Sequence, residues 1–193
     1  MTSNTLASKL FRADCRRLAV ITAVVATAAL TSCAATGKDA PPSPPPSVTF
    51  AENGVTVNLT VIKWKAHNGT VQVKFTPDKA GFHLYSTALP AGGIEGVGRP
   101  TAVSFDGGLT ASKRPTASEA VRTIHVPGVT GAVPVYPDGP VTLTVPVHAS
   151  TGKASALVSY ASCSITEGCS LPVKNHPVAI HITADGITFE QHR

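Results

Sequence analysis

Two cysteines, Cys163 and Cys169, are the residues of this sequence whose type and spacing suit a chemical function. They lie in the stretch Tyr160-Ala-Ser-Cys-Ser-Ile-Thr-Glu-Gly-Cys-Ser-Leu-Pro172, with five residues between them. This spacing at the end of a strand can bring the two Cα atoms within the roughly 4.4–6.8 Å that a disulfide needs. Such a pair either cycles between dithiol and disulfide, as in a redox carrier, or is oxidised once and remains a structural cross-link.

The short loop between the cysteines argues against a purely stabilising cross-link, although the spacing alone does not exclude a structural disulfide. Closing it constrains the unfolded chain by only about 2 kcal/mol, less than a cross-link between distant strands. His176 and His181 would complete a set of four zinc ligands with the cysteines, but the spacing fits no usual zinc ribbon and His181 falls in an alternating strand. We therefore expect no metal and no cofactor.

Residues 1–32 have the pattern of a bacterial lipoprotein signal peptide. A positively charged region precedes an apolar run at residues 18–30, which is too short to span a membrane as a helix of about 20 residues. Leu30-Thr-Ser-Cys33 then resembles a lipobox, in which the cysteine is acylated and becomes the first residue after cleavage. An ordinary secretory signal with an incidental cysteine is the alternative. The pattern predicts lipidation at Cys33 and a location on the extracytoplasmic face of the cell membrane.

Residues 33–47 are predicted to be the lipidated cysteine and a tether. The run Pro41-Pro-Ser-Pro-Pro-Pro46 favours extended polyproline II structure, at about 3.1 Å per residue. Four of the 16 Lys and Arg residues and one of the 11 Asp and Glu residues lie in the signal segment, which leaves a net charge of about +2 for the exported part. Nucleic-acid binding needs cations clustered along one face, so no nucleic-acid partner is expected.

The third predicted segment, residues 48–193, has the pattern of an all-β domain. The chain is 42% hydrophobic and 14% charged, with 16 Gly and 16 Pro to mark turns. Apolar and polar residues alternate, as in half-buried strands, and the clearest examples are residues 55–61, 71–75, 141–147 and 178–182. Seven to nine short strands separated by turns predict an immunoglobulin-like antiparallel β-sandwich.

Two turns in this domain can be predicted from local sequence. His67-Asn68-Gly69 indicates a hairpin turn, because Asn and Gly tolerate a positive φ. Ser150-Thr-Gly-Lys153 indicates a second turn, between the alternating segment 141–147 and a strand at residues 156–161. The second of these strands leads into the cysteine pair.

Two blocks of the sequence resemble the amino-terminal domain of DsbD, the bacterial thiol:disulfide interchange protein. The first block comprises residues 141–147, Ala156-Leu-Val-Ser-Tyr-Ala-Ser-Cys163 and Gly168-Cys169-Ser-Leu-Pro172. In that family a strand ends in Tyr-x-x-Cys, and a second cysteine follows six positions later with a Gly beside it and a Pro soon after. Gly81-Phe-His-Leu-Tyr85 is similar to an upstream aromatic strand of the same family.

The resemblance implies an immunoglobulin-like sandwich in which Cys163 and Cys169 are the redox pair. Family members take electrons from a thioredoxin-like domain fed by a membrane thiol transporter, and pass them to extracytoplasmic disulfide-containing proteins. The sequence has no Cys-x-x-Cys motif, so the donor and the transporter are expected on separate chains. The sequence leaves open which cysteine attacks. It also leaves open a non-catalytic binding or adaptor lipoprotein with a structural disulfide.

Further residues are candidates to support the pair. Tyr160 and Leu171 are expected either to pack beside the disulfide or to have ordinary core roles, and Pro172 completes the family motif. Three charged or titratable side chains either tune a thiolate or are solvated loop charges: Glu167, Lys174 and His176. Family members cover the disulfide with a cap loop of acidic and aromatic residues. The corresponding residues 123–136 contain no acid, Phe or Trp, so either this loop does not shield the disulfide or the shielding comes from His125, Val126 or Tyr136.

Overall fold

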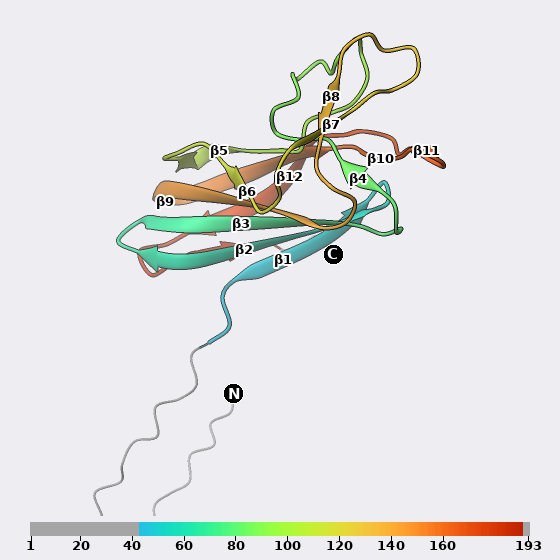
Figure 1. Cartoon of the computed structure of the whole chain (residues 1–193). Coiled ribbons are helices and arrows are strands. Elements are labelled where there is room, and N and C mark those ends of the chain that lie inside the picture. Colours follow the sequence, from blue (N-terminus) through green and yellow to red (C-terminus); the bar gives the residue numbers. More distant parts are fainter. Residues whose placement is uncertain (1–42, 191–193) are drawn as a thin grey trace, which may run out of the picture. The chain divides into compact units, whose positions relative to one another are not determined.

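A computed structural model describes residues 43–190, and these residues form strands and turns without any helix (Figure 1). No helix that could cross a membrane is therefore present between residues 43 and 190. The predicted signal peptide, Cys33 and most of the predicted tether lie outside the described residues. Residues 43–46 are exposed and irregular, and the first strand begins at Ser47.

Thirteen strands are present in the described part of the chain. Seven of them have two or three residues, too few to show a periodic pattern, which explains why the sequence predicted only seven to nine. The strands are β1 (Ser47–Glu52), β2 (Val55–Lys65), β3 (Asn68–Pro77), β4 (His83–Leu84), β5 (Ala102–Ala111), β6 (Thr116–Ala117), β7 (Arg122–Ile124), β8 (Val133–Val135), β9 (Val141–Tyr160), β10 (Ser162–Ser164), β11 (Gly168–Cys169), β12 (Val173–Ile182) and β13 (Ile187–Phe189).

The 20-residue strand β9 organises the largest sheet. The sheet has eight antiparallel strands in the order β1-β2-β3-β9-β12-β13, and β5 and β6 also pair with β9. The first part of β9 pairs with β3 and the second part with β12, so β9 passes from one layer of the sandwich to the other (Figure 1). The predicted fold class, an all-β immunoglobulin-like antiparallel sandwich, is confirmed.

The predicted turn at residues 150–153 is wrong, because β9 continues through it. Strand β5 pairs with β9 on both sides of this segment, from Leu109 opposite Ala149 to Gly107 opposite Ala154, and this pairing keeps the chain extended. A bulge in β5 and the positive φ of Gly152 (124°) take up the bend. The two strands predicted on either side of residues 150–153 are therefore one bent strand, β9.

The main core lies between the layers and is built from the predicted alternating segments. Their apolar side chains are buried, whereas the residues between them are half-buried or exposed, so the predicted period of two is confirmed for β2, β3, β12 and the first half of β9. Burying each such aliphatic side chain contributes about 1.5–3 kcal/mol relative to leaving it exposed. This core holds the end of β9 in place, and the cysteines follow directly after it.

The predicted hairpin between β2 and β3 is present, but its turn lies earlier than expected. Lys65 pairs with Asn68, and Ala66 and His67 have positive φ values of 46° and 64°. Gly69 lies in the strand, where an added Cβ would be 2.6 Å from Cε3 of the Trp64 ring. The glycine is therefore needed for the packing of Trp64 and not for the turn.

Two small sheets and a second apolar cluster lie at the cysteine end of the domain (Figure 1). One sheet has the order β11-β10-β4, and the other is the β7–β8 hairpin. Ala161 is the single residue between β9 and β10, so the main sandwich positions the cysteines through the backbone. We call residues 86–100 and 122–135 the cap, and its buried apolar side chains form the cap cluster with three residues outside it. The buried members of this cluster are Tyr85, Leu89, Val133, Val135, Ala161 and Cys163.

Candidate functional site

Cys163 and Cys169 form a disulfide, with an S–S distance of 2.01 Å and a Cα–Cα distance of 4.0 Å. The two residues are directly opposite each other in the antiparallel pair β10 and β11. Between them the chain turns tightly, because the Ser164 hydroxyl accepts hydrogen bonds from the backbone N–H groups of Thr166 and Glu167. The disulfide thus joins neighbouring strands of one hairpin and does not connect distant parts of the fold.

The two sulfur-bearing residues differ strongly in exposure. Cys169 lies in the edge strand β11 and is exposed, whereas Cys163 is 4% exposed and belongs to the cap cluster. An incoming thiolate must reach a sulfur along the axis of the S–S bond. The arrangement therefore allows attack at Cys169 and makes Cys163 the sulfur that leaves.

Tyr85 places a hydroxyl beside both sulfurs. Its oxygen lies 3.0 Å from Sγ of Cys163 and 3.7 Å from Sγ of Cys169. The residue is 2% exposed, and burial raises the pKa of its hydroxyl above the ordinary value of 10, so the hydroxyl keeps its proton. Because sulfurs in a disulfide carry no proton, Tyr85 is the donor. The same donor would stabilise a thiolate formed when the disulfide opens.

Tyr85→Phe is expected to raise the pKa of the buried Cys163 thiol by about 1–2 units. A hydrogen bond to a charged group contributes about 1.5–3 kcal/mol, and one pKa unit corresponds to 1.36 kcal/mol. The pH dependence of iodoacetamide reaction, followed at each cysteine by mass spectrometry, measures this shift. Tyr136→Phe is the matched control, because the Tyr136 hydroxyl contacts Thr87 and not the sulfurs. Equal profiles for the two variants would show that the Tyr85 hydroxyl does not act on the thiolate.

Gly98 holds the Tyr85 ring in place from within the cap. It has a φ of 88°, and an added Cβ would be 2.6 Å from Cε1 of Tyr85 and 2.9 Å from Cδ2 of Leu89. Gly96 has a similar φ of 81°, but no atom lies within 4 Å of the corresponding position. An alanine at Gly96 would add only backbone strain, whereas an alanine at Gly98 would add the same strain and also displace the Tyr85 ring.

Gly98→Ala is expected to make the disulfide open faster to dithiothreitol than Gly96→Ala does. Both changes carry the strain of a positive φ, but only the first pushes on the ring that covers Cys163. A clash of this kind typically costs about 1–3 kcal/mol, so the rate should increase by about tenfold. Second-order rates of reduction by dithiothreitol test this. Equal rates would show that the ring does not shield the disulfide.

The cap shields Cys163 with side chains that the sequence only partly indicated. Among the predicted shielding residues, Val126 packs against the cap cluster, His125 is exposed, and Tyr136 belongs to the main core. The cap also contains an acid outside residues 123–136. Glu95 accepts hydrogen bonds from the backbone N–H and the hydroxyl of Thr130, and these bonds lower the pKa of its carboxyl. They tie together two segments of the cap.

The other predicted supporting residues are spread over different surroundings. Tyr160 is fully buried in the main core, where its hydroxyl donates to the Glu52 carbonyl at 2.9 Å and burial raises its pKa. Leu171 is 75% exposed, and Pro172 is exposed beside it. Glu167 pairs with Lys79, with 3.0 Å between Oε2 and Nζ. This pairing reduces the repulsion that an isolated Glu167 would exert on a thiolate at Cys169.

The two histidines considered as zinc ligands do not join the cysteines. Nδ1 of His176 is 2.7 Å from Oε2 of Glu52, and its ring stacks on Phe50 with centroids 3.9 Å apart. His181 is exposed on β12, and Lys174 is exposed on the same strand. Within residues 43–190, no three His, Cys, Asp or Glu side chains gather as metal ligands would.

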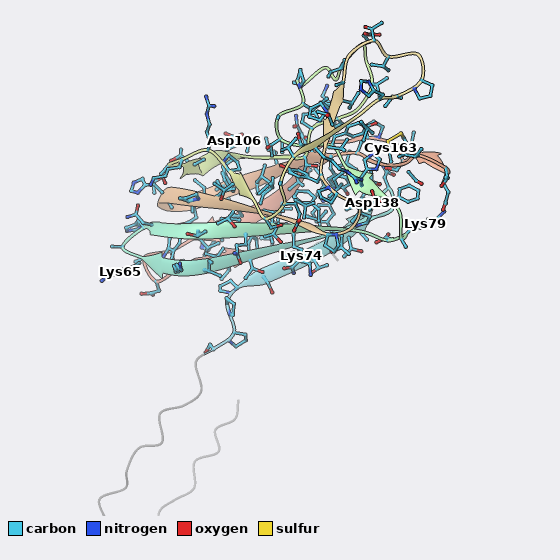
Figure 2. All side chains as sticks on the ribbon, in the orientation of Figure 1. Lys65, Lys74, Lys79, Asp106, Asp138 and Cys163 are labelled. Carbon is cyan, nitrogen blue, oxygen red and sulfur yellow. A yellow bond between two sulfur atoms is a disulfide. The ribbon has the colours of Figure 1, made fainter. Side chains whose placement is uncertain are left out.

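A buried histidine that the sequence did not single out lies directly across from Cys163. His83 of β4 is paired with Cys163 of β10 and is 1% exposed. Its Nδ1 is 3.5 Å from Oδ1 of Asp138, and that same oxygen is 2.7 Å from Nη2 of Arg122. Figure 2 shows the labelled Cys163, Asp138 and Lys79 at the same end of the domain. His83 and Tyr85 both occur in the Gly81–Tyr85 block, and the resemblance of this block to the family's aromatic strand was the only indication of them in the sequence.

A shallow groove of about 460 Å³ opens beside Cys169. Its lining residues come from the β1–β2 turn, the segment before β4 and the cysteine hairpin, and include Asn53, Lys79, Phe82, Ser162, Cys169 and Ser170. Two large apolar side chains on the hairpin are also exposed, Ile165 by 83% and Leu171 by 75%. The exposed sulfur thus lies beside a hollow and apolar groups.

Comparison with known proteins gives the fold of the domain. No protein-family model matches the sequence, and no curated protein matches it significantly. The structure is similar to the N-terminal periplasmic domain of ScsB from Proteus mirabilis, with a TM-score of 0.52, 10% identity, and coverage of 76% of this chain and 54% of that chain. It is also similar to the reduced N-terminal domain of DsbD from Neisseria meningitidis, with a TM-score of 0.41, 17% identity, and coverage of 76% and 90%. This chain therefore spans about half of the ScsB domain structure and shares its fold.

Proposed function

We propose that this protein is an extracytoplasmic thiol:disulfide exchange module that works through Cys163 and Cys169. The observation that carries the proposal is the asymmetric disulfide, in which one cysteine is exposed on an edge strand and the other is buried beneath a cap. Exchange needs one accessible sulfur and one that resolves the intermediate. Likeness of fold to a periplasmic domain supports the proposed location, and the signal-like residues 1–32 with Cys33 support a lipid-anchored form at the membrane.

The proposed reaction begins with a partner thiolate that attacks Sγ of Cys169. A mixed disulfide forms between the partner and Cys169, the S–S bond to Cys163 breaks, and Cys163 leaves as a thiolate beside the Tyr85 hydroxyl. A second thiol of the partner then attacks the partner sulfur that is bound to Cys169, and Cys169 is released as a thiolate. The module has gained two electrons, and the partner has become a disulfide. The reverse sequence passes the electrons to a disulfide-containing client.

The surroundings of Cys169 support docking of a partner with an exposed thiol. The groove beside Cys169 and the exposed side chains of Ile165 and Leu171 offer apolar surface around the sulfur. We propose a thioredoxin-like donor, itself supplied by a membrane thiol transporter, and extracytoplasmic client proteins with disulfides. The proposal needs no cofactor, because thiol exchange moves electrons through covalent S–S bonds.

A binding or adaptor protein with a permanent disulfide is the second candidate. The burial of Cys163 and the intact cap favour it, because both protect the bond from reduction. In this case the exposed apolar residues near Cys169 would bind a partner without any thiol:disulfide exchange. The two candidates therefore differ in the energy of the disulfide and not in the fold.

The reduction potential of the purified domain separates the two candidates. For an exchange module we expect a value of roughly −180 to −270 mV, the range of thioredoxin-like proteins and disulfide isomerases. Equilibration in glutathione and dithiothreitol buffers, with the reduced fraction measured by alkylation and mass spectrometry, gives this value. A potential below about −300 mV would indicate a structural bond and contradict the proposal.

A further inference from the structure

Beyond the cysteines, we propose that His83, assisted by Asp138, accepts the proton of the Cys163 thiol when Cys163 resolves a mixed disulfide. This inference rests on the proposed exchange function and adds a residue to its chemistry. It concerns the step in which the reduced module is reoxidised by a client. In that step Cys163 must attack from within the cap, where a free thiolate is costly.

The position of His83 follows from the register of the small sheet. His83 and Cys163 are directly opposite each other in the antiparallel pair β4 and β10, so their side chains leave the same face with Cβ atoms about 4.5–5.5 Å apart. Cys169 occupies the next place across the sheet, opposite Cys163. The His83 ring also contacts the Tyr85 ring edge to face, with centroids 6.2 Å apart. One face of this sheet therefore carries the imidazole, the phenol and both sulfurs.

The surroundings of His83 leave its imidazole free to take up a proton. Both ring nitrogens are buried and neither has a hydrogen-bond partner among residues 43–190, and Nδ1 lies 3.5 Å from Oδ1 of Asp138. A buried nitrogen without a partner is costly unless it serves a purpose. An imidazole with a carboxylate near one nitrogen and no partner at the other resembles the arrangement that proton acceptors beside nucleophiles use.

The charges around His83 set the direction of proton transfer. The titratable and charged groups that face it are Asp138 before β9, Arg122 of β7, Tyr85 after β4 and the cysteines of β10 and β11. Burial and, to a smaller extent, Arg122 lower the pKa of His83 below 6.5, against the opposing effect of Asp138. His83 is therefore neutral above pH 6.5 and can accept a proton, and Asp138 stabilises the imidazolium that forms.

The proposed step moves one proton to His83 and two electrons to the client. The thiol proton of Cys163 moves to His83, and Sγ of Cys163 attacks Sγ of Cys169, which is joined to the client sulfur. The Cys163–Cys169 bond forms, the Cys169–client bond breaks, and the client sulfur leaves as a thiolate with the electron pair. His83 then returns its proton to that thiolate or to water. The cysteine pair has lost two electrons, and the client disulfide has gained them.

The test follows the mixed disulfide directly, with oxidised glutathione as the probe. The reduced protein is mixed with excess oxidised glutathione, quenched in acid at successive times, and analysed by mass spectrometry for the Cys169–glutathione adduct and its decay. His83→Gln is expected to slow the decay about 100-fold at pH 7, the lower part of the range for acid–base catalysis. His181→Gln, exposed on β12, is the matched control and should decay at the original rate.

The pH profile distinguishes proton transfer from a merely structural role. In the unchanged protein the decay rate should vary little between pH 7 and 9, because His83 is already neutral, and should fall as the pH drops below 6.5. In His83→Gln the rate should rise about tenfold per pH unit, because attack then depends on the small thiolate fraction of Cys163. Asp138→Asn should slow the decay of the adduct about tenfold. Because the Asp138 side chain is half-exposed, this change should not disturb folding, so it tests the step even if His83→Gln does not fold.

The outcomes separate this inference from the proposed function. One outcome is that the unchanged protein forms and resolves the adduct at the same rate, and with the same pH profile, as His83→Gln and Asp138→Asn. In that case His83 is not the proton acceptor. If the unchanged protein never forms the adduct, the exchange function itself fails. Slowed decay with the steep profile in His83→Gln, or the tenfold slowing in Asp138→Asn alone, supports the proposal.

Discussion

Cys163→Ser is expected to leave a reactive thiol that captures partners, whereas Cys169→Ser is expected to abolish rapid exchange. In the first variant the exposed Cys169 still attacks a disulfide, but no second sulfur resolves the adduct, so it persists. In the second variant the remaining thiol of Cys163 is 4% exposed and reacts only after the cap opens locally. An opening that costs about 3 kcal/mol slows the reaction about 100-fold.

Reaction of both reduced variants with oxidised glutathione measures this difference. We expect a stable one-glutathione adduct for Cys163→Ser and a rate at least about 100-fold lower for Cys169→Ser. The two variants are matched controls for each other, because each keeps one cysteine and loses the disulfide. Faster reaction at Cys163 would reverse the assigned order of attack, and equal rates would mean that the cap does not protect Cys163 in the reduced protein.

Tyr160→Ala is expected to destabilise the domain by about 3–5 kcal/mol, the usual cost of deleting a large buried aromatic side chain. Tyr160 is fully buried, contacts the Phe75 ring edge to face at 5.6 Å, and donates a hydrogen bond to Glu52 across the sandwich. Domains of this size have a free energy of unfolding of about 5–15 kcal/mol, so this loss is a large fraction of the total.

Tyr160→Phe separates packing from the hydrogen bond. It keeps the ring and should cost about 1 kcal/mol, measured by urea unfolding of the oxidised protein. Its reduction potential should stay within about 15 mV of the original value, because the Tyr160 hydroxyl contacts Glu52 and not the sulfurs. A larger change in potential would contradict a purely core role and support the alternative that Tyr160 packs beside the disulfide.

The sequence predicted those parts of the fold that depend on local periodicity. Alternating apolar residues identified β2, β3, β12 and the first half of β9, because a strand with one buried face repeats every two residues. The continuation of β9 through residues 150–153 could not be predicted, because β5, a partner distant in sequence, keeps this segment extended. The turn at Ala66 and His67 was missed because the register of β2 on β3 shifts between Ile62 and Lys65, and no local residue pattern marks this shift.

The cysteine pair could be predicted from the sequence, but its surroundings could not. Cys163 and Cys169 are close in the chain, so their spacing alone suggested a disulfide. Tyr85, His83 and Asp138 lie far from them in sequence and reach them only through the pairing of β4 with β10 and the packing of the cap. Their residue types are common, and only the resemblance of the Gly81–Tyr85 block to the same family linked His83 and Tyr85 to the cysteines; nothing marked Asp138.

The division of the apolar side chains into a main core and a cap cluster has a consequence for how such a protein can change over time. The main core determines whether the chain folds, whereas the cap cluster covers Cys163 and borders the surface around it. Substitutions in residues 86–100 and 122–135 can therefore alter which partners gain access while the sandwich stays intact. Folding and specificity are inherited through separate sets of residues, so a lineage can acquire a new partner without losing its scaffold.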